Sequence, residues 1–176
     1  MDPQATAVEP PLGSVGLTQI HGKVGRLIRF GQWLNGDGYE DYEHAFVFVG
    51  GGRIVEAEPG GAREADLSEY AANTVVWIEC PPEYGQAVAD EARKLVGTKY
   101  SFVDYLALFL HRMRLWVPFL RWYVRSSRRL ICSALADRAA RRGGWGLFVT
   151  PPIWEGYVTP GMLYRLYLKL LAPQSA

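Results

Sequence analysis

The sequence is poor in cysteine, histidine and lysine. Its 176 residues include two cysteines and three histidines, and lysine supplies only four of the nineteen basic residues. Two cysteines, Cys80 and Cys132, cannot form a disulfide framework, and neither belongs to a C-x-x-C or H-x-x-x-H pattern. The composition therefore excludes a disulfide-stapled fold and argues against a structural zinc site. We expect no cofactor.

Motifs for nucleotides, calcium and nucleic acids are missing as well. Gly50-Gly51-Gly52 lacks both the spacing and the following helix of a phosphate loop. Residues 35–43, NGDGYEDYE, are acidic but lack the ligand spacing of a calcium loop, so we expect an acidic surface loop. No nucleic-acid-binding motif accompanies the arginines, and a nucleic-acid partner is not expected.

The chain starts without the cationic stretch and apolar run of a secretory signal peptide. We therefore expect the protein to be cytoplasmic, or to be delivered as part of a virion or by specialised secretion. The Pro-containing residues 1–15 are predicted to be a flexible arm. With 49% hydrophobic residues in the chain, residues 16–176 are predicted to form a single domain around one core.

Charge is sorted along the sequence. Residues 37–91 contain thirteen acids and two arginines, whereas residues 92–142 contain twelve bases and two acids. Two arrangements follow from this asymmetry: two faces of opposite sign, or charges that neutralise each other within the fold.

The hydrophobic patterns predict a mixed α+β domain. Two β-rich runs, 45–49 and 53–57, are joined by three glycines and form a predicted hairpin. Residues 74–80 are a third predicted strand. Helical patterns cover residues 17–34, 83–97, 101–117, 131–142 and 161–171, and Thr159 is the predicted N-cap of the last helix.

His44 and Glu56 are ionisable residues within the predicted hairpin. In a hairpin centred near Gly51 they are expected to face each other to within about one register step, because their midpoint is Gly50. A carboxylate in that position selects which ring nitrogen carries the proton and favours the imidazolium. A structural role remains open for each of them, although a buried carboxylate rarely lacks a partner.

Cys132 is the candidate nucleophile. It lies at the first turn of the helix predicted for residues 131–142, just after Arg128 and Arg129. Helix N-termini and nearby cations favour a thiolate over a thiol, and a backbone N–H there can stabilise an oxyanion. The alternative is a small buried residue with a packing role. Together, His44, Glu56 and Cys132 have the roles of acid/base, orienting carboxylate and nucleophile.

The order His44, Glu56, Cys132 resembles the circularly permuted branch of the NlpC-type papain-like superfamily of cysteine peptidases and amidases. In that branch a His begins the first hairpin strand, an acidic or polar residue follows in the next strand, and the Cys starts a later helix. The spacing of His44 and Glu56 is also similar to the two-histidine spacing of lecithin:retinol acyltransferase relatives, with Glu in place of the second His. Supporting matches are GRLIRFGQWL before His44, GTKYSF at 97–102 and VTPGMLYRL at 158–166, so the resemblance covers residues 16–168.

The resemblance implies a small antiparallel sheet packed against the nucleophile helix and further helices. It also implies hydrolysis of an amide through a thioester, in a peptide or a peptidoglycan stem peptide, with the Tyr100 hydroxyl lining the substrate site. Two alternatives remain open: an enzyme that transfers or hydrolyses a lipid acyl group with the same triad, and a catalytically silent structural or interaction module, for instance in a phage particle.

Residues 102–129 depart from the family pattern. They hold seven aromatic residues and six arginines, and their charges interrupt any run long enough to span a bilayer. Such a segment suits a membrane surface or an acidic protein partner, and it equally suits a core-packing helix with solvated arginines.

Overall fold

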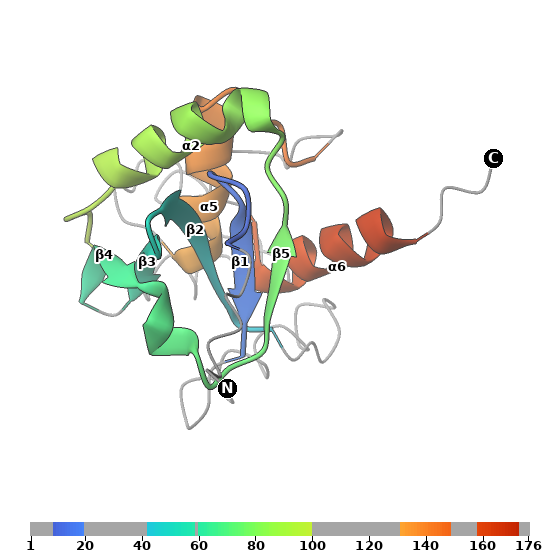
Figure 1. Ribbon diagram of the computed structural model, residues 1–176, viewed down its shortest axis with the longest axis horizontal. Helices are drawn as coiled ribbons and strands as arrows, with labels where there is room; N and C mark the ends of the chain where they lie inside the picture. Colours follow the sequence, from blue (N-terminus) through green and yellow to red (C-terminus); the bar gives the residue numbers. More distant parts are fainter. Residues whose placement is uncertain (1–8, 20–41, 59, 100–130, 149–157, 173–176) are drawn as a thin grey trace, which may run out of the picture.

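The five strands of the sheet come from two parts of the chain. The computed structural model describes residues 9–19, 42–58, 60–99, 131–148 and 158–172 (Figure 1). The strands are β1 (Val15–Thr18), β2 (His44–Gly50), β3 (Arg53–Glu58), β4 (Gly61–Asp66) and β5 (Val75–Ile78). They form an antiparallel sheet in the order β4-β3-β2-β1-β5, which places β2 at its centre.

The turn between β2 and β3 consists of glycines because its backbone needs positive φ. Gly50, Gly51 and Gly52 have φ angles of 89°, 60° and 68°. Residues other than glycine are strained in this region. The predicted hairpin is confirmed, and the predicted third strand is β5.

Two helices cover one face of the sheet. Helices α2 (Pro82–Lys94) and α5 (Cys132–Arg142) contact each other and β2, and Figure 1 shows them side by side. Their buried apolar residues form one core with Val47 and Val55 of the sheet. Because β2 is covered on both faces, six of its seven residues are buried.

The opposite face of the sheet is covered by aromatic side chains and a short helix. Phe46 and Phe48 of β2 pack there with Trp77 of β5, and Tyr70 of the 3-10 helix η1 (Leu67–Tyr70) packs against this cluster. Gly16 lies opposite Phe46 and Trp77 on the two neighbouring strands. A Cβ at Gly16 would lie 2.2 Å from the Phe46 ring, so only glycine fits there.

Helix α6 (Pro160–Leu171) begins beside β1 and α5 and extends outward past β5 (Figure 1). Its first turn is capped as predicted, because the Thr159 hydroxyl accepts the Met162 N–H at 3.2 Å. The predicted helices at 83–97, 131–142 and 161–171 are confirmed as α2, α5 and α6. No helix among the described residues is both long and apolar enough to cross a membrane.

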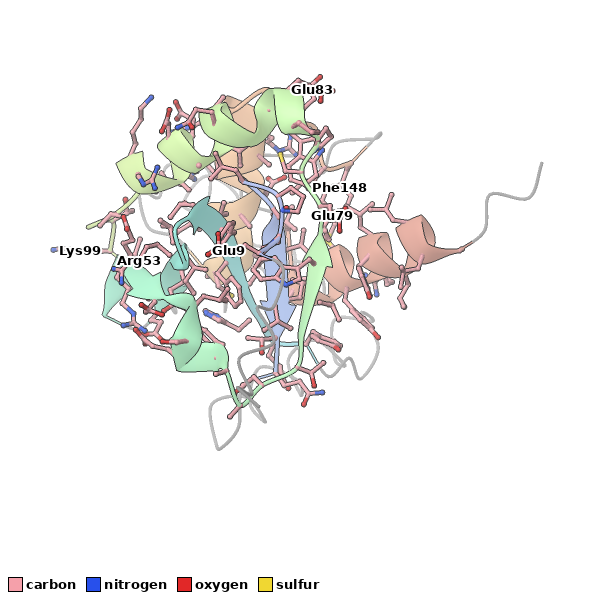
Figure 2. All side chains as sticks on the ribbon, in the orientation of Figure 1. Glu9, Arg53, Glu79, Glu83, Lys99 and Phe148 are labelled. Carbon is pink, nitrogen blue, oxygen red and sulfur yellow. The ribbon has the colours of Figure 1, made fainter. Side chains whose placement is uncertain are left out.

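The two edges of the sheet lie on opposite sides of the molecule. Figure 2 shows Arg53 and Lys99 on the side of β4, whereas Glu79 and Glu83 lie on the side of β5 and the start of α2. The central strands, which carry the candidate site, lie between these two charged edges.

The structure corrects two predictions near the N-terminus. Ser14 and Val15, assigned to the flexible arm of residues 1–15, are buried, and β1 begins at Val15. The helix predicted for residues 17–34 is wrong at its start, because Leu17 and Thr18 belong to β1; residues 20–34 lie outside the described residues. The β4 strand was not predicted. The predicted helix at 101–117 and the segment 102–129 lie outside the described residues.

Candidate active site

His44 and Glu56 form a hydrogen-bonded ion pair across β2 and β3. His44 Nε2 lies 2.6 Å from Glu56 Oε2, and both side chains are buried. The pairing is diagonal: Glu56 is paired with Phe46 in the ladder, and His44 lies two residues before Phe46 in β2. Residues two apart share one face of a strand, so the two side chains meet on the face that carries the aromatic cluster.

The Glu56 carboxylate has two further partners that were not predicted from the sequence, a hydrogen-bond donor and an ion-pair partner. The Tyr70 hydroxyl donates a short hydrogen bond to Oε2, the oxygen that also accepts from His44. Arg63, paired with Glu56 in the β3–β4 ladder, places Nη2 2.7 Å from Oε1. Pro59-Gly60-Gly61 is a turn sequence that could have placed Arg63 opposite Glu56. No local pattern indicated the contact with Tyr70.

Tyr70 is held in place by the local structure of η1. The Asp66 side chain accepts the Ser68 N–H at 2.8 Å, and the Glu69 side chain accepts the Asp66 N–H, which together form a capping box. Glu69 also accepts a hydrogen bond of 2.8 Å from Arg63. The short helix and β4 are thereby joined beside the carboxylate.

Cys132 is the first residue of α5 and is 5% exposed. Its thiol donates to the Glu43 carbonyl at 3.8 Å and interacts with the His44 side chain, an interaction that raises the pKa of His44. Because Nε2 of His44 faces Glu56, Nδ1 is the ring nitrogen left for the thiol. The N–H groups of the first turn of a helix have no intrahelical acceptor, so they remain available to an oxyanion beside the sulfur.

The start of α5 is fixed by its second residue. The buried Ser133 hydroxyl donates to the Val158 carbonyl at 2.6 Å, just before α6 begins. Tyr42 stacks on Tyr164 of α6 with ring centroids 4.5 Å apart, two residues before His44. These contacts connect the thiol, the imidazole and α6 through neighbouring residues. The predicted influence of Arg128 and Arg129 falls outside the described residues.

The electrostatics favour an ionised pair of imidazolium and carboxylate. Burial by itself lowers the pKa of His44, but hydrogen bonds to Cys132 and Glu56, together with their charges, outweigh it and raise the pKa to about 10. Burial raises the pKa of Glu56, but the hydrogen bond and charge of His44, the Tyr70 hydroxyl and the Arg63 charge hold it below its usual 4.5.

Cys80, the other cysteine, lies in a different environment. It follows β5, and burial, together with the charge of Glu83, raises the pKa of its thiol to about 11. Its backbone N–H donates to the Ser14 hydroxyl at 3.0 Å. The two thiols are therefore chemically distinct, and only Cys132 contacts a histidine among the described residues.

Tyr100, the predicted substrate-lining residue, lies outside the described residues, so its role stays a prediction. Within the part of the chain that the structure describes, no three His, Cys, Asp or Glu residues are placed to hold a metal ion.

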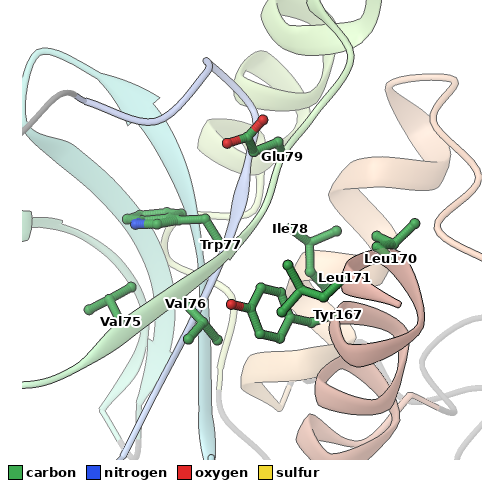
Figure 3. A pocket seen from close by; sticks show the side chains of 8 residues that line it. All are labelled: Val75, Val76, Trp77, Ile78, Glu79, Tyr167, Leu170 and Leu171. Carbon is green, nitrogen blue, oxygen red and sulfur yellow. The ribbon is translucent and has the colours of Figure 1, made fainter. Parts of the chain in front are cut away.

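A groove of about 520 Å³ lies between β5 and α6, and Cys132 is not among its lining residues (Figure 3). Its lining includes Val76 and Ile78 from the strand and Tyr167, Leu170 and Leu171 from the helix. Figure 3 shows Tyr167 pointing toward β5, with the two leucines at the end of α6 beside Ile78. The groove is thus a second feature able to contact an apolar ligand.

The arrangement at Cys132 places a thiol, an imidazole and a carboxylate in one interacting series. Such a series can move a proton between sulfur and a leaving group while the carboxylate fixes the imidazole. Comparison with known proteins adds no assignment, because no protein-family model and no curated protein matches the chain.

Proposed function

We propose that the protein is a cysteine hydrolase that cleaves an amide bond through a thioester. The observation that carries the proposal is the position of His44, which contacts Cys132 at the start of α5 and, on its other nitrogen, the buried Glu56 carboxylate at 2.6 Å. The three residues come from three separate elements. Packing alone does not explain why these three residues meet, because burying an ion pair is costly unless its geometry is good.

The proposed reaction uses these groups in two steps. The Cys132 thiolate attacks the amide carbonyl, and the oxyanion accepts hydrogen bonds from N–H groups at the start of α5. The C–N bond breaks as the His44 imidazolium donates its proton to the leaving amine, giving a thioester. His44 then takes a proton from water, whose oxygen attacks the thioester and releases the carboxylic acid, which restores the Cys132 thiolate and the His44 imidazolium. Glu56 holds His44 throughout.

The proposed fold family is the permuted papain-like fold of the NlpC-type superfamily. Support comes from the antiparallel sheet packed against the helix that begins with Cys132, and from the position of His44 at the first residue of β2. The same resemblance proposes a peptide or a peptidoglycan stem peptide as the substrate, with no cofactor.

A second candidate is transfer or hydrolysis of a lipid acyl group by the same three residues. The groove between β5 and α6 favours it because apolar side chains, among them Ile78, Leu170 and Leu171, line part of it. Tyr164, which stacks on Tyr42 near His44, also stacks on Tyr167 in that groove, with centroids 6.1 Å apart. An acyl chain in the groove would therefore lie along the same helix that contacts the residues before His44.

The test is thiol labelling combined with hydrolysis. Wild-type protein, Cys132→Ala and the matched control Cys80→Ala are treated with iodoacetamide at pH 7 and assayed on peptide amides, peptidoglycan fragments and acyl esters. We expect Cys80→Ala to keep both labelling and hydrolysis and Cys132→Ala to lose both. Labelling that persists in Cys132→Ala at the wild-type rate would contradict the proposal.

The substrate panel separates the candidates. Turnover of amides alone supports the hydrolase, and turnover of acyl esters alone supports the lipid enzyme. If Cys132 is not labelled and no substrate is turned over, the protein is an interaction module and the proposed function is wrong.

A further inference from the structure

Glu56 accepts hydrogen bonds or ion pairs from three different elements, although it is fully buried. His44 contacts it from β2, Arg63 from β4 and Tyr70 from η1. A buried carboxylate needs partners on both oxygens, because each unpaired charged group in the interior costs several kcal/mol, on the order of 3–5. The number of donors exceeds what one orienting contact with His44 requires.

The donors are divided between the two carboxylate oxygens. His44 and Tyr70 share Oε2, whereas the Arg63 guanidinium lies 2.7 Å from Oε1. Rotation of the carboxylate would break at least two of these contacts at once. The plane of the carboxylate is therefore fixed, and with it the direction in which His44 Nε2 must point.

Arg63 has a second property, its charge. Its side chain is 41% exposed and also pairs with Glu58 at 3.2 Å and Glu69 at 2.8 Å. A cation beside Glu56 offsets part of the negative charge that the imidazolium of His44 experiences. It also favours the anionic form of the carboxylate itself.

We propose that Arg63 and Tyr70 are positioning residues for the proposed reaction, and that the Arg63 charge sets the pH range in which the site is ionised. The inference rests on the proposed function, because it assigns roles around the same Glu56 and His44. Tyr70 acts through its hydroxyl on Oε2. Arg63 acts through its charge, which forms an ion pair with Oε1.

The sign of the Arg63 effect follows from electrostatics. Removal of a cation makes protonation of every neighbouring group more favourable, so the pKa values of both Glu56 and His44 should rise. Tyr70 is a neutral donor, so its loss should raise only the pKa of Glu56. The titratable and charged groups around the site come from five elements: His44 of β2, Glu58 of β3, Arg63 of β4, Tyr70 and Glu69 of η1, and Cys132 of α5.

The experiment compares Arg63→Gln with Arg63→Lys and with the control Arg53→Gln. Arg53 is equally exposed and pairs with acidic residues of β4, but it does not contact Glu56 among the described ion pairs. The pKa values of Glu56 and His44 are measured by NMR titration of the carboxyl carbon and the imidazole nitrogens. Thermal unfolding shows which variants are folded.

We expect both pKa values to rise in Arg63→Gln by roughly half a unit to one unit, less than the 1–3 units of a buried arginine neighbour because Arg63 is partly exposed. Arg63→Lys should keep most of the wild-type values, and Arg53→Gln should keep them all. Tyr70→Phe, which retains the ring stacked on His44, should raise the Glu56 value alone. Unchanged values in Arg63→Gln, or equal shifts in Arg53→Gln, would overturn the inference.

The pH profile of Cys132 alkylation by iodoacetamide gives the functional readout. Its limbs should move to higher pH in Arg63→Gln and return with Arg63→Lys. If the pKa values shift as expected while the protein hydrolyses no substrate, the proposed function fails, and only the effect of the Arg63 charge on the ionisation of Glu56 and His44 stands. If hydrolysis is present and Arg63→Gln leaves the pKa values and the alkylation profile unchanged, the inference fails and the function stands.

Discussion

The Glu56 carboxylate reaches His44 diagonally across the sheet. In the β2–β3 ladder Glu56 is paired with Phe46, yet its Oε2 lies 2.6 Å from Nε2 of His44. His44 is the first residue of β2, and Cys132 lies near this end of the strand, where its thiol contacts the Glu43 carbonyl. If Glu56 were paired directly with His44, the two side chains would lie opposite each other. In the observed diagonal pairing, the Glu56 carboxylate points along the strand toward the end of β2 that lies near Cys132.

Replacement of Glu56 by Gln should slow catalysis without unfolding the protein. The amide keeps one acceptor oxygen but removes the charge that stabilises the imidazolium, so the pKa of His44 should fall. The comparable change in a serine triad costs about 10⁴ in turnover, and a thiolate depends less on its orienter. We expect a loss of roughly 10- to 1,000-fold. Full turnover with a normal rate of Cys132 labelling would leave Glu56 a structural role only.

The pH dependence of stability should show the His44–Glu56 pair. The pKa of Glu56 is lowered, so its contribution is present above 4.5 and is lost as the pH falls through its folded value. The pKa of His44 is raised from 6.5 to about 10, so its contribution is complete below 6.5 and is lost as the pH rises toward 10. The pair should therefore stabilise most between about pH 4.5 and 6.5.

Urea unfolding at a series of pH values measures this contribution. Other groups titrate as well, so the comparison is with His44→Asn, which lacks the ionisable ring. We expect wild-type protein to lose stability relative to His44→Asn between pH 7 and 10. Parallel curves for the two proteins would show that the imidazole is not protonated in the folded state at pH 7.

Removal of the Ser133 hydroxyl should loosen the start of α5. Ser133→Ala deletes the 2.6 Å bond to the Val158 carbonyl. A buried acceptor left without its donor costs about 1–3 kcal/mol, so the free energy of unfolding should fall by that amount. Cys132 labelling should change because the thiol is the neighbouring residue. A variant of unchanged stability would indicate that another donor replaces the hydroxyl.

Gly16 should tolerate no side chain. In Gly16→Ala the added Cβ would meet the rings of Phe46 and Trp77, and overpacking of this kind costs about 1–3 kcal/mol. Gly60→Ala is the control, because nothing lies within 4 Å of a Cβ added there. Thermal unfolding of both variants measures the difference. Equal melting temperatures would show that the two rings can move apart.

The three site residues could be predicted because each is marked by a local pattern. His44 and Glu56 are polar residues in apolar runs beside a glycine turn, and Cys132 begins an amphipathic helix. The hairpin centre predicted near Gly51 agrees with the observed pairs Phe46–Glu56 and Phe48–Ile54, but the irregularity between Phe48 and Gly50 was not predicted. Irregularities of this kind shift a register without leaving a pattern in the sequence.

The missed elements depend on contacts distant in sequence. Strand β4 has the sequence GAREAD, which is poor in β-branched and aromatic residues, and it is a strand because it pairs along all of β3. Strand β1 has only four residues, one of them Gly16, and it is buried between two other strands. Tyr70 reaches Glu56 only through the placement of η1. Such contacts follow from tertiary structure and leave no periodic pattern in the sequence.

The position of β1 between β2 and β5 has a consequence for the order of assembly during synthesis. β1 leaves the ribosome first, yet its neighbours β2 and β5 begin only at residues 44 and 75. Strands β2 to β4 are consecutive hairpins with short connections, and closing a short loop costs less entropy than closing a long one. We expect this meander to form first and β1 to dock onto it. His44 and Glu56 would then be paired before the ribosome has added Cys132. The nascent chain would therefore contain the oriented base before it contains the nucleophile.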